Sequence, residues 1–113
     1  MKSYTDVEQS KKLVGILPLE SADMLWMKET KDYYEAVNVP YIESTAEEDD
    51  GLPCWSLATL LNMIPNPSLH RVPDGWRCDC YDKDGNFLAM SYGETPVDAC
   101  YEIIIRLYNL KIL

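Results

Sequence analysis

Residues 93–102 constrain the fold of this chain most, because they determine where its last helix begins. Thr95 can cap a helix with its side-chain oxygen, and Pro96 suits the first helical position, where a missing N–H costs no hydrogen bond. Asp98 lies three residues after the cap, near the positive end of the helix dipole. Apolar residues then recur at helical spacing, so the sequence predicts a well-buried helix over residues 96–109.

The size and charge of the chain limit its classes of function. A chain of 113 residues fits one domain, and folding buries roughly 65% of the surface that the unfolded chain exposes. The net charge of −9 argues against direct binding of nucleic acid, which depends on Lys and Arg. No run approaches the ~20 apolar residues that span a bilayer, and the amino terminus lacks the apolar core of a secretory signal. We therefore expect a single cytoplasmic domain, residues 1–113, without a membrane partner.

The first half of the sequence predicts a helix and two strands. Residues 5–8 have the pattern of a capping box, and a helix over about residues 5–16 follows and ends before Pro18. Aromatic and β-branched residues predict strands over residues 24–29 and 33–42, with a hairpin turn between them.

An acidic segment separates the two halves. Residues 43–51 contain five carboxylates in nine residues and no periodic apolar partner, which is typical of a loop. After it, residues 53–64 are expected to form a helix, with Ser56 as the cap and Trp55 packed on Leu60. Pro65 ends this helix.

The next segment predicts a β-hairpin. Residues 75–82 alternate between two faces of a strand, a turn is expected at residues 82–86, and residues 87–92 return as the antiparallel partner. The turn sequence is also similar to half of a calcium loop, but the distal glutamate that such a loop requires is missing. One strand face carries Trp76, Cys78 and Cys80, and the other carries Arg77, Asp79 and Tyr81.

These elements give an α+β fold with the order α-β-β-α-β-β-α. We expect a mainly antiparallel sheet of two hairpins with the helices packed on one face. Both helices that precede a hairpin end in Leu-x-x-aliphatic-aliphatic-Pro, at residues 13–18 and 60–65. A degenerate internal duplication of an αββ unit is one interpretation, and two ordinary amphipathic helices stopped by proline are the other.

The aromatic content indicates a candidate interaction surface. The chain has 8 tyrosines and 3 tryptophans, and tyrosine is enriched at protein interfaces because it buries area with little entropy loss. If helices cover one face of the sheet, the other face presents its side chains to a partner. The candidate residues are Arg77, Asp79, Tyr81 and Tyr92, and the partner is a protein, either a different one or a second copy. Ordinary surface aromatics are the alternative interpretation.

The four cysteines are expected to be reduced. Cys78 and Cys80 point the same way from a strand, so a zinc site with Cys54 and Cys100 is conceivable, but the spacing is not that of a zinc knuckle and core packing is the favoured interpretation. Cys54 is separately a candidate reactive thiol, because a thiol near a helix start has a lowered pKa. The single histidine, His70, is expected in a proline-flanked loop, so no catalytic residue, cofactor or metal site is predicted.

Two blocks resemble a known family: Pro53-Cys54-Trp55-Ser56-Leu57-Ala58-x-Leu60-Leu61 and Gly93-x-Thr95-Pro96-Val97-Asp98-Ala99-Cys100-Tyr101-Glu102. Together with the terminal Leu-rich helix, they are similar to small acidic proteins of gut Bacteroides-type bacteria and their phages or mobile elements. The resemblance covers about residues 52–113. It implies a shared fold and a bacterial or phage cytosolic setting, and it assigns no functional residue.

Three classes of function follow from these observations. The preferred hypothesis is a non-catalytic protein-interaction or accessory module. The second is an acidic decoy that binds a nucleic-acid-binding protein, or a HicB-like antitoxin, since such antitoxins also place a capped helix after a hairpin; this chain, however, lacks a recognisable DNA-binding tail. The third is a thiol enzyme centred on Cys54.

Overall fold

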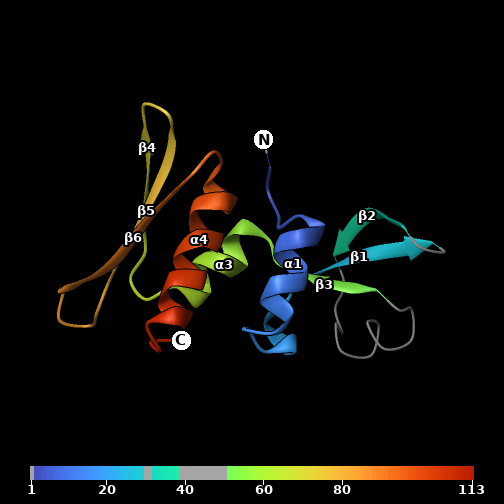
Figure 1. Cartoon of the computed structure of the whole chain (residues 1–113), viewed down its shortest axis with the longest axis horizontal. Coiled ribbons are helices and arrows are strands. Elements are labelled where there is room, and N and C mark those ends of the chain that lie inside the picture. Colours follow the sequence, from blue (N-terminus) through green and yellow to red (C-terminus); the bar gives the residue numbers. More distant parts are fainter. Residues whose placement is uncertain (1, 30–31, 39–50) are drawn as a thin grey trace. The chain divides into compact units, whose positions relative to one another are not determined.

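The computed structural model describes residues 2–29, 32–38 and 51–113 and confirms the α+β class (Figure 1). The chain divides into two compact units: the first unit comprises residues 4–59, and the second comprises residues 60–113 with residues 1–3. That the whole chain forms one domain stays a prediction. Most of the predicted acidic loop, residues 43–50, lies outside the described residues, as do residues 30–31 of the predicted turn and 39–42 of the second predicted strand.

The first unit combines one helix with a three-stranded antiparallel sheet. Helix α1 (Val7–Val14) is followed by a short 3-10 turn (Leu19–Ser21). Strands β1 (Met24–Glu29), β2 (Asp32–Asn38) and β3 (Leu52–Cys54) pair in the order β2-β1-β3. Helix α1 packs against β3, so the helix and the sheet share one core.

The start of α1 differs from the prediction. Asp6 caps the helix: its carboxylate accepts the N–H of Gln9 at 2.8 Å, and the Gln9 side chain accepts the N–H of Asp6 at 3.1 Å. The predicted cap, Thr5, instead pairs with the chain after β3, donating its N–H to the Trp55 carbonyl at 3.0 Å. A capping box placed one residue later satisfies the same helix-end donors, because Asp and Thr are both good caps.

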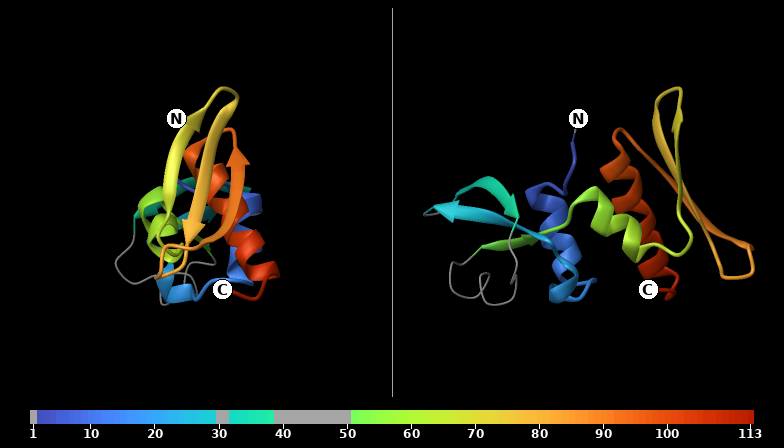
Figure 2. Two further views of the ribbon diagram at one scale, coloured as in Figure 1. Left: turned by 90° about the vertical axis from the view of Figure 1, so that its left-hand side faces the viewer. Right: turned by 180° about the vertical axis from the view of Figure 1, so that it is seen from behind.

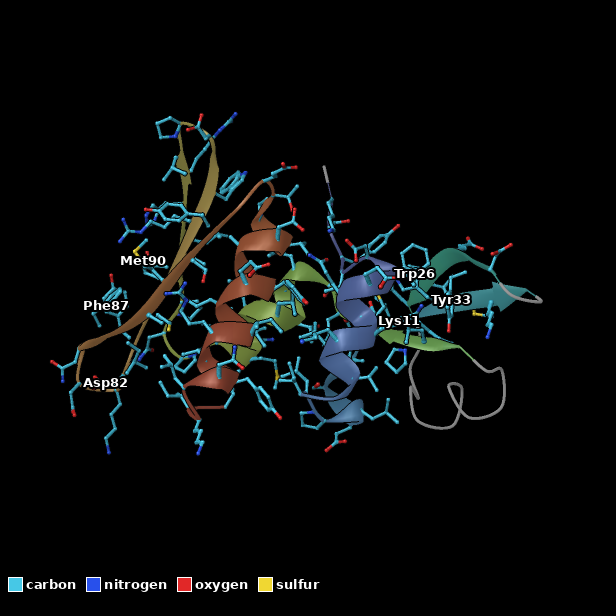
Figure 3. The ribbon with its side chains drawn as sticks, viewed as in Figure 1. Lys11, Trp26, Tyr33, Asp82, Phe87 and Met90 are labelled. Atoms are coloured by element: carbon cyan, nitrogen blue, oxygen red, sulfur yellow. The ribbon has the colours of Figure 1, made fainter. Side chains whose placement is uncertain are left out.

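Aromatic contacts join the segment before α1 to the sheet of the first unit. The Trp26 indole N–H donates to the Thr5 carbonyl at 3.0 Å, and its ring meets that of Tyr4 edge to face. In the same first unit, the ammonium groups of Lys11 and Lys28 lie 5.9 and 5.5 Å, respectively, from the centre of the Tyr33 ring. Figure 3 shows Lys11, Trp26 and Tyr33 gathered where α1 meets the sheet.

The helix predicted over residues 53–64 is shorter than expected. Its first residues form strand β3, which pairs with β1, and helix α3 covers only Leu57–Met63. The Ser56 hydroxyl accepts the N–H of Thr59 at 3.3 Å, which confirms Ser56 as the cap. Leu52–Cys54 form a strand rather than the start of the helix because pairing with β1 supplies hydrogen-bond partners that the first turn of a helix lacks.

The second unit is a three-stranded antiparallel meander covered by a helix. Strands β4 (Ser68–Val72), β5 (Gly75–Tyr81) and β6 (Phe87–Gly93) pair in the order β4-β5-β6, and helix α4 (Pro96–Asn109) lies along one face (Figure 2). The predicted last helix is confirmed at both ends. Thr95 caps it, accepting the N–H of Asp98 at 3.2 Å.

Strand β4 was not predicted, and it places His70 in a strand rather than in a loop. Three of its five side chains are exposed, so it lacks the apolar alternation by which strands are recognised. In the sheet of the second unit the central strand is β5, which is the second of its three strands along the chain. In the sheet of the first unit the central strand is β1, which is the first along the chain. The two sheets are therefore connected differently. The interpretation as an internal duplication is supported only by the similar sequences at residues 13–18 and 60–65.

Candidate functional site

The residues of the predicted interaction surface lie on one face of the second unit's sheet. Arg77 is directly opposite His70 on β4 and Tyr92 on β6, and Asp79 is opposite Met90. Residues that pair directly point to the same face of a sheet. We call this side the outer face, and its members used below are His70, Arg77, Asp79, Tyr81, Phe87, Met90 and Tyr92.

Helix α4 covers the opposite face of the same sheet. The helix packs on β5 and β6, and Cys78, which alternates with the outer-face residues on β5, is completely buried, as is Cys100 of α4. Figure 3 shows Phe87 and Met90 pointing away from α4. In the second unit the outer face is thus the side of the sheet on which α4 does not pack.

A buried carboxylate lies at the centre of the outer face. Asp79 is only 3% exposed, and its Oδ1 lies 2.7 Å from Nε of Arg77. His70 approaches the other oxygen, with 3.7 Å between Nε2 and Oδ2. The hydrogen bond to Asp79 raises the pKa of Arg77, and the charged guanidinium partners the buried carboxylate. The hydrogen bond thus holds Asp79 and Arg77 together in the middle of the face, and His70 lies beside them.

Exposed aromatic side chains flank this ion pair. Phe87 is 55% exposed and Tyr92 is 54% exposed. The Phe87 ring meets the Tyr81 ring edge to face, with 6.0 Å between their centres. Aromatic residues, Met and Arg are the types enriched at protein interfaces, so the composition of the outer face matches that of a docking surface.

A hollow of about 560 Å³ lies at the end of this sheet, beside the turn between β4 and β5. Its lining includes two aromatic residues, Trp76 and Tyr92, and two exposed acidic residues, Asp74 and Glu94. The volume lies within the range of small-ligand pockets. Sequence reasoning missed this hollow, because it forms only where β4 turns back onto β5.

Cys54 does not have the environment expected of a reactive thiol. It lies in β3 rather than at a helix start, it is completely buried, and burial raises the pKa of its thiol. The thiol donates to the Thr5 carbonyl at 3.3 Å, and the Thr5 hydroxyl lies 3.5 Å from Sγ. The expected lowering of the Cys54 pKa is therefore wrong, because the thiol sits in the core before α3 begins.

The other cysteines are also buried and carry free thiols. The hydrogen bond between Cys78 and Cys100 lowers the pKa of Cys78 and, together with burial, raises that of Cys100. Within residues 2–29, 32–38 and 51–113, no three His, Cys, Asp or Glu side chains lie together as they would around a metal ion. The thiols of Cys78 and Cys100 belong to the packing between sheet and helix.

The turn between β5 and β6 is held by Asp82. Its Oδ1 accepts the N–H groups of Asp84 and Asn86, each at 2.9 Å, and its Oδ2 accepts the Asn86 side-chain amide at 3.2 Å. These bonds lower the pKa of the Asp82 carboxyl, the largest contribution coming from the Asn86 N–H. The carboxylate thus organises the predicted hairpin turn.

Comparison of the chain with known proteins identified no relative. No protein-family model, no curated protein and no solved structure matches the chain. Among the described helices, none is long and apolar enough to cross a membrane. The candidate site therefore rests on the residues of this chain.

Proposed function

We propose that this chain is a non-catalytic protein-interaction module that docks a partner protein on its outer face. One observation carries the proposal: Asp79, 3% exposed and paired with Arg77, is flanked by aromatic side chains that are more than half exposed. A cytosolic bacterial or phage setting is part of the same proposal.

The physical argument concerns the cost of docking. Binding requires that polar groups be desolvated and side chains be ordered, and each long side chain that must be fixed costs about 0.5–1.5 kcal/mol. On the outer face, Asp79 is already desolvated and Arg77 is already held by it. The exposed rings of Phe87 and Tyr92 supply large apolar area with few rotatable bonds. A partner can therefore bury the apolar area of the outer face at a low free-energy cost for desolvating and ordering its side chains.

The charge of the chain favours a different protein over a second copy. Each copy has a net charge of −9, so two copies repel one another at long range. A partner with basic residues is attracted by the same field. We therefore infer a partner of opposite charge that carries apolar residues for the outer face.

Affinity capture from lysate of the source cells, at low and high salt, tests the proposal. The bait is the full chain, compared with Phe87→Ser and with the control Leu110→Ser, whose side chain is also 55% exposed. We expect a protein that is retained at high salt and captured by wild type and by the control. With the purified partner, Phe87→Ser should weaken binding by roughly tenfold or more, as expected for an interface hot spot.

Other outcomes overturn the proposal. A basic partner that is lost at high salt and insensitive to Phe87→Ser favours the acidic decoy, because salt screens exposed charges but not apolar contacts. Equal loss with Phe87→Ser and Leu110→Ser indicates adhesion through any exposed apolar residue. Failure to capture a partner at either salt also contradicts docking on this face.

A further inference from the structure

We propose that the hollow beside the β4–β5 turn binds the guanidinium group of an arginine side chain. The inference deepens the proposed function and rests on it, because it names the chemistry by which the partner is recognised. The hollow includes Tyr92 of the outer face in its lining, so a docked segment that covers the outer face can reach it.

The lining of the hollow combines the two features that attract organic cations. Tyr92, on the outer face, is aromatic, and the negative face of an aromatic ring attracts a cation that lies within about 6 Å. Asp74 and Glu94 add two carboxylates at the same place. A guanidinium group suits this lining better than an ammonium group does, because it stacks on aromatic rings and binds carboxylates through two hydrogen bonds.

The carboxylates of the hollow are available for such a ligand. Both Asp74 and Glu94 are exposed, and among the described residues neither forms an ion pair with Lys, Arg or His. By contrast, Asp79 and Asp98 each form an ion pair with a basic side chain at a distance of 2.7 Å. The two acidic residues of the hollow therefore have their charges free to bind a cation.

The backbone beside the hollow is closely packed. Gly75 has a φ of +149°, and a Cβ there would lie 2.4 Å from the carbonyl oxygen of Gly93, which itself lines the hollow. Only glycine tolerates both this conformation and this approach. The close contact between β5 and β6 holds the backbone at Gly93, beside the hollow, in place before any ligand arrives, which lowers the cost of binding.

A titration followed by NMR of the isotope-labelled full chain tests this inference. The probe is Nα-acetyl-arginine methylamide, and its matched neutral control is the citrulline counterpart, in which the guanidinium becomes an uncharged urea group. We expect the arginine probe to shift the backbone amide signals of residues 74–76 and 92–94, and the citrulline probe to leave them unchanged. Binding of a single side chain should be weak, in the millimolar range.

Matched charge variants locate the site. We expect the double variant Asp74→Asn with Glu94→Gln to weaken binding of the arginine probe by about tenfold. The control double variant, Glu20→Gln with Asp84→Asn, removes the same charge from exposed positions outside the hollow and should bind as wild type does.

Three results overturn the inference: equal shifts with the citrulline probe, equal weakening in the control double variant, or shifts that occur only outside residues 72–76 and 92–94. The inference and the proposed function fail in different ways. If the arginine probe does not bind but a Phe87-dependent partner is captured, only the arginine site is wrong. If the probe binds at the hollow but no Phe87-dependent partner exists, docking on the outer face is wrong.

Discussion

The hydroxyl of Thr5 connects separate segments of the first unit. This side chain is completely buried, and its Oγ1 lies 2.8 Å from the Ser10 hydroxyl. It also accepts the N–H of Trp55 at 3.2 Å. A buried backbone N–H that loses its acceptor costs free energy, so this one residue supports the junction between the start of the chain, α1 and the segment after β3.

We expect Thr5→Val to lower the free energy of unfolding by about 1–3 kcal/mol, because the Trp55 N–H then loses its hydroxyl acceptor. Thr5→Ser keeps the hydroxyl and should retain most of the stability. Urea denaturation of the three proteins measures the effect. Equal stability of Thr5→Val and wild type would show that the hydroxyl does not support the fold.

Asp82 makes the stability of the second unit depend on pH. Its pKa is lowered below the usual value near 3.8, chiefly by the Asn86 N–H. A carboxyl whose pKa is lowered by folding stabilises the folded state above its unfolded pKa, and this contribution disappears as the pH falls through the lower, folded value. The contribution is therefore complete at neutral pH and lost in acid.

We expect Asp82→Asn, which keeps an acceptor oxygen but cannot ionise, to be less stable than wild type at pH 7. The difference should shrink as the pH falls below the unfolded pKa of the carboxyl, near 3.8. Urea unfolding midpoints at pH 7, 3 and 2 test this. The control is Asp84→Asn, which removes a neighbouring charge but none of the hydrogen bonds that Asp82 accepts. A difference that is the same at every pH would contradict the role of the charge.

At the scale of elements, the junction between β6 and α4 tolerates no added side chain. A Cβ at Gly93 would lie 2.3 Å from the backbone nitrogen of Ala99 and 2.6 Å from the backbone carbon of Asp98. Both neighbours are in the first turn of α4 and cannot move without disturbing the helix that Thr95 caps. The end of the strand and the start of the helix are therefore packed backbone to backbone.

We expect Gly93→Ala to lower the free energy of unfolding by about 1–3 kcal/mol, the usual cost of overpacking. Gly15→Ala is the control, because among the described residues a Cβ there meets only the Lys12 carbonyl oxygen, at an ordinary 3.7 Å. The control should be neutral or slightly more stable, since alanine restricts the unfolded chain. Thermal and urea unfolding measure both, and a neutral Gly93→Ala would refute the close packing.

The elements also show which parts of a fold a sequence encodes locally. The bounds of α4 were predicted correctly because a cap, a proline and an apolar period all lie within the helix itself. Strands β3 and β4 were missed because each is defined by the strand with which it pairs, and neither has an apolar alternation of its own. Long-range pairing leaves no signal in a short window of sequence.

At the scale of the whole molecule, the same distinction applies to the candidate site. Alternation along β5 predicted that Arg77, Asp79 and Tyr81 share a face, and the strand pairing places them so. The contact between His70 and Asp79, and the hollow beside the β4–β5 turn, depend on β4 and could not be predicted. The net charge of −9 follows from the composition alone, but it indicates a class of partner rather than a place of contact.

The burial of all four cysteines has a practical consequence. Thiol-directed dyes react with accessible thiolates, so a single cysteine introduced on the surface would be the preferred target in the native protein. Lys83, exposed in the turn at one end of the outer face, is a suitable position for Lys83→Cys. A fluorophore attached there would report the arrival of a partner by its change in emission, without removal of any native cysteine.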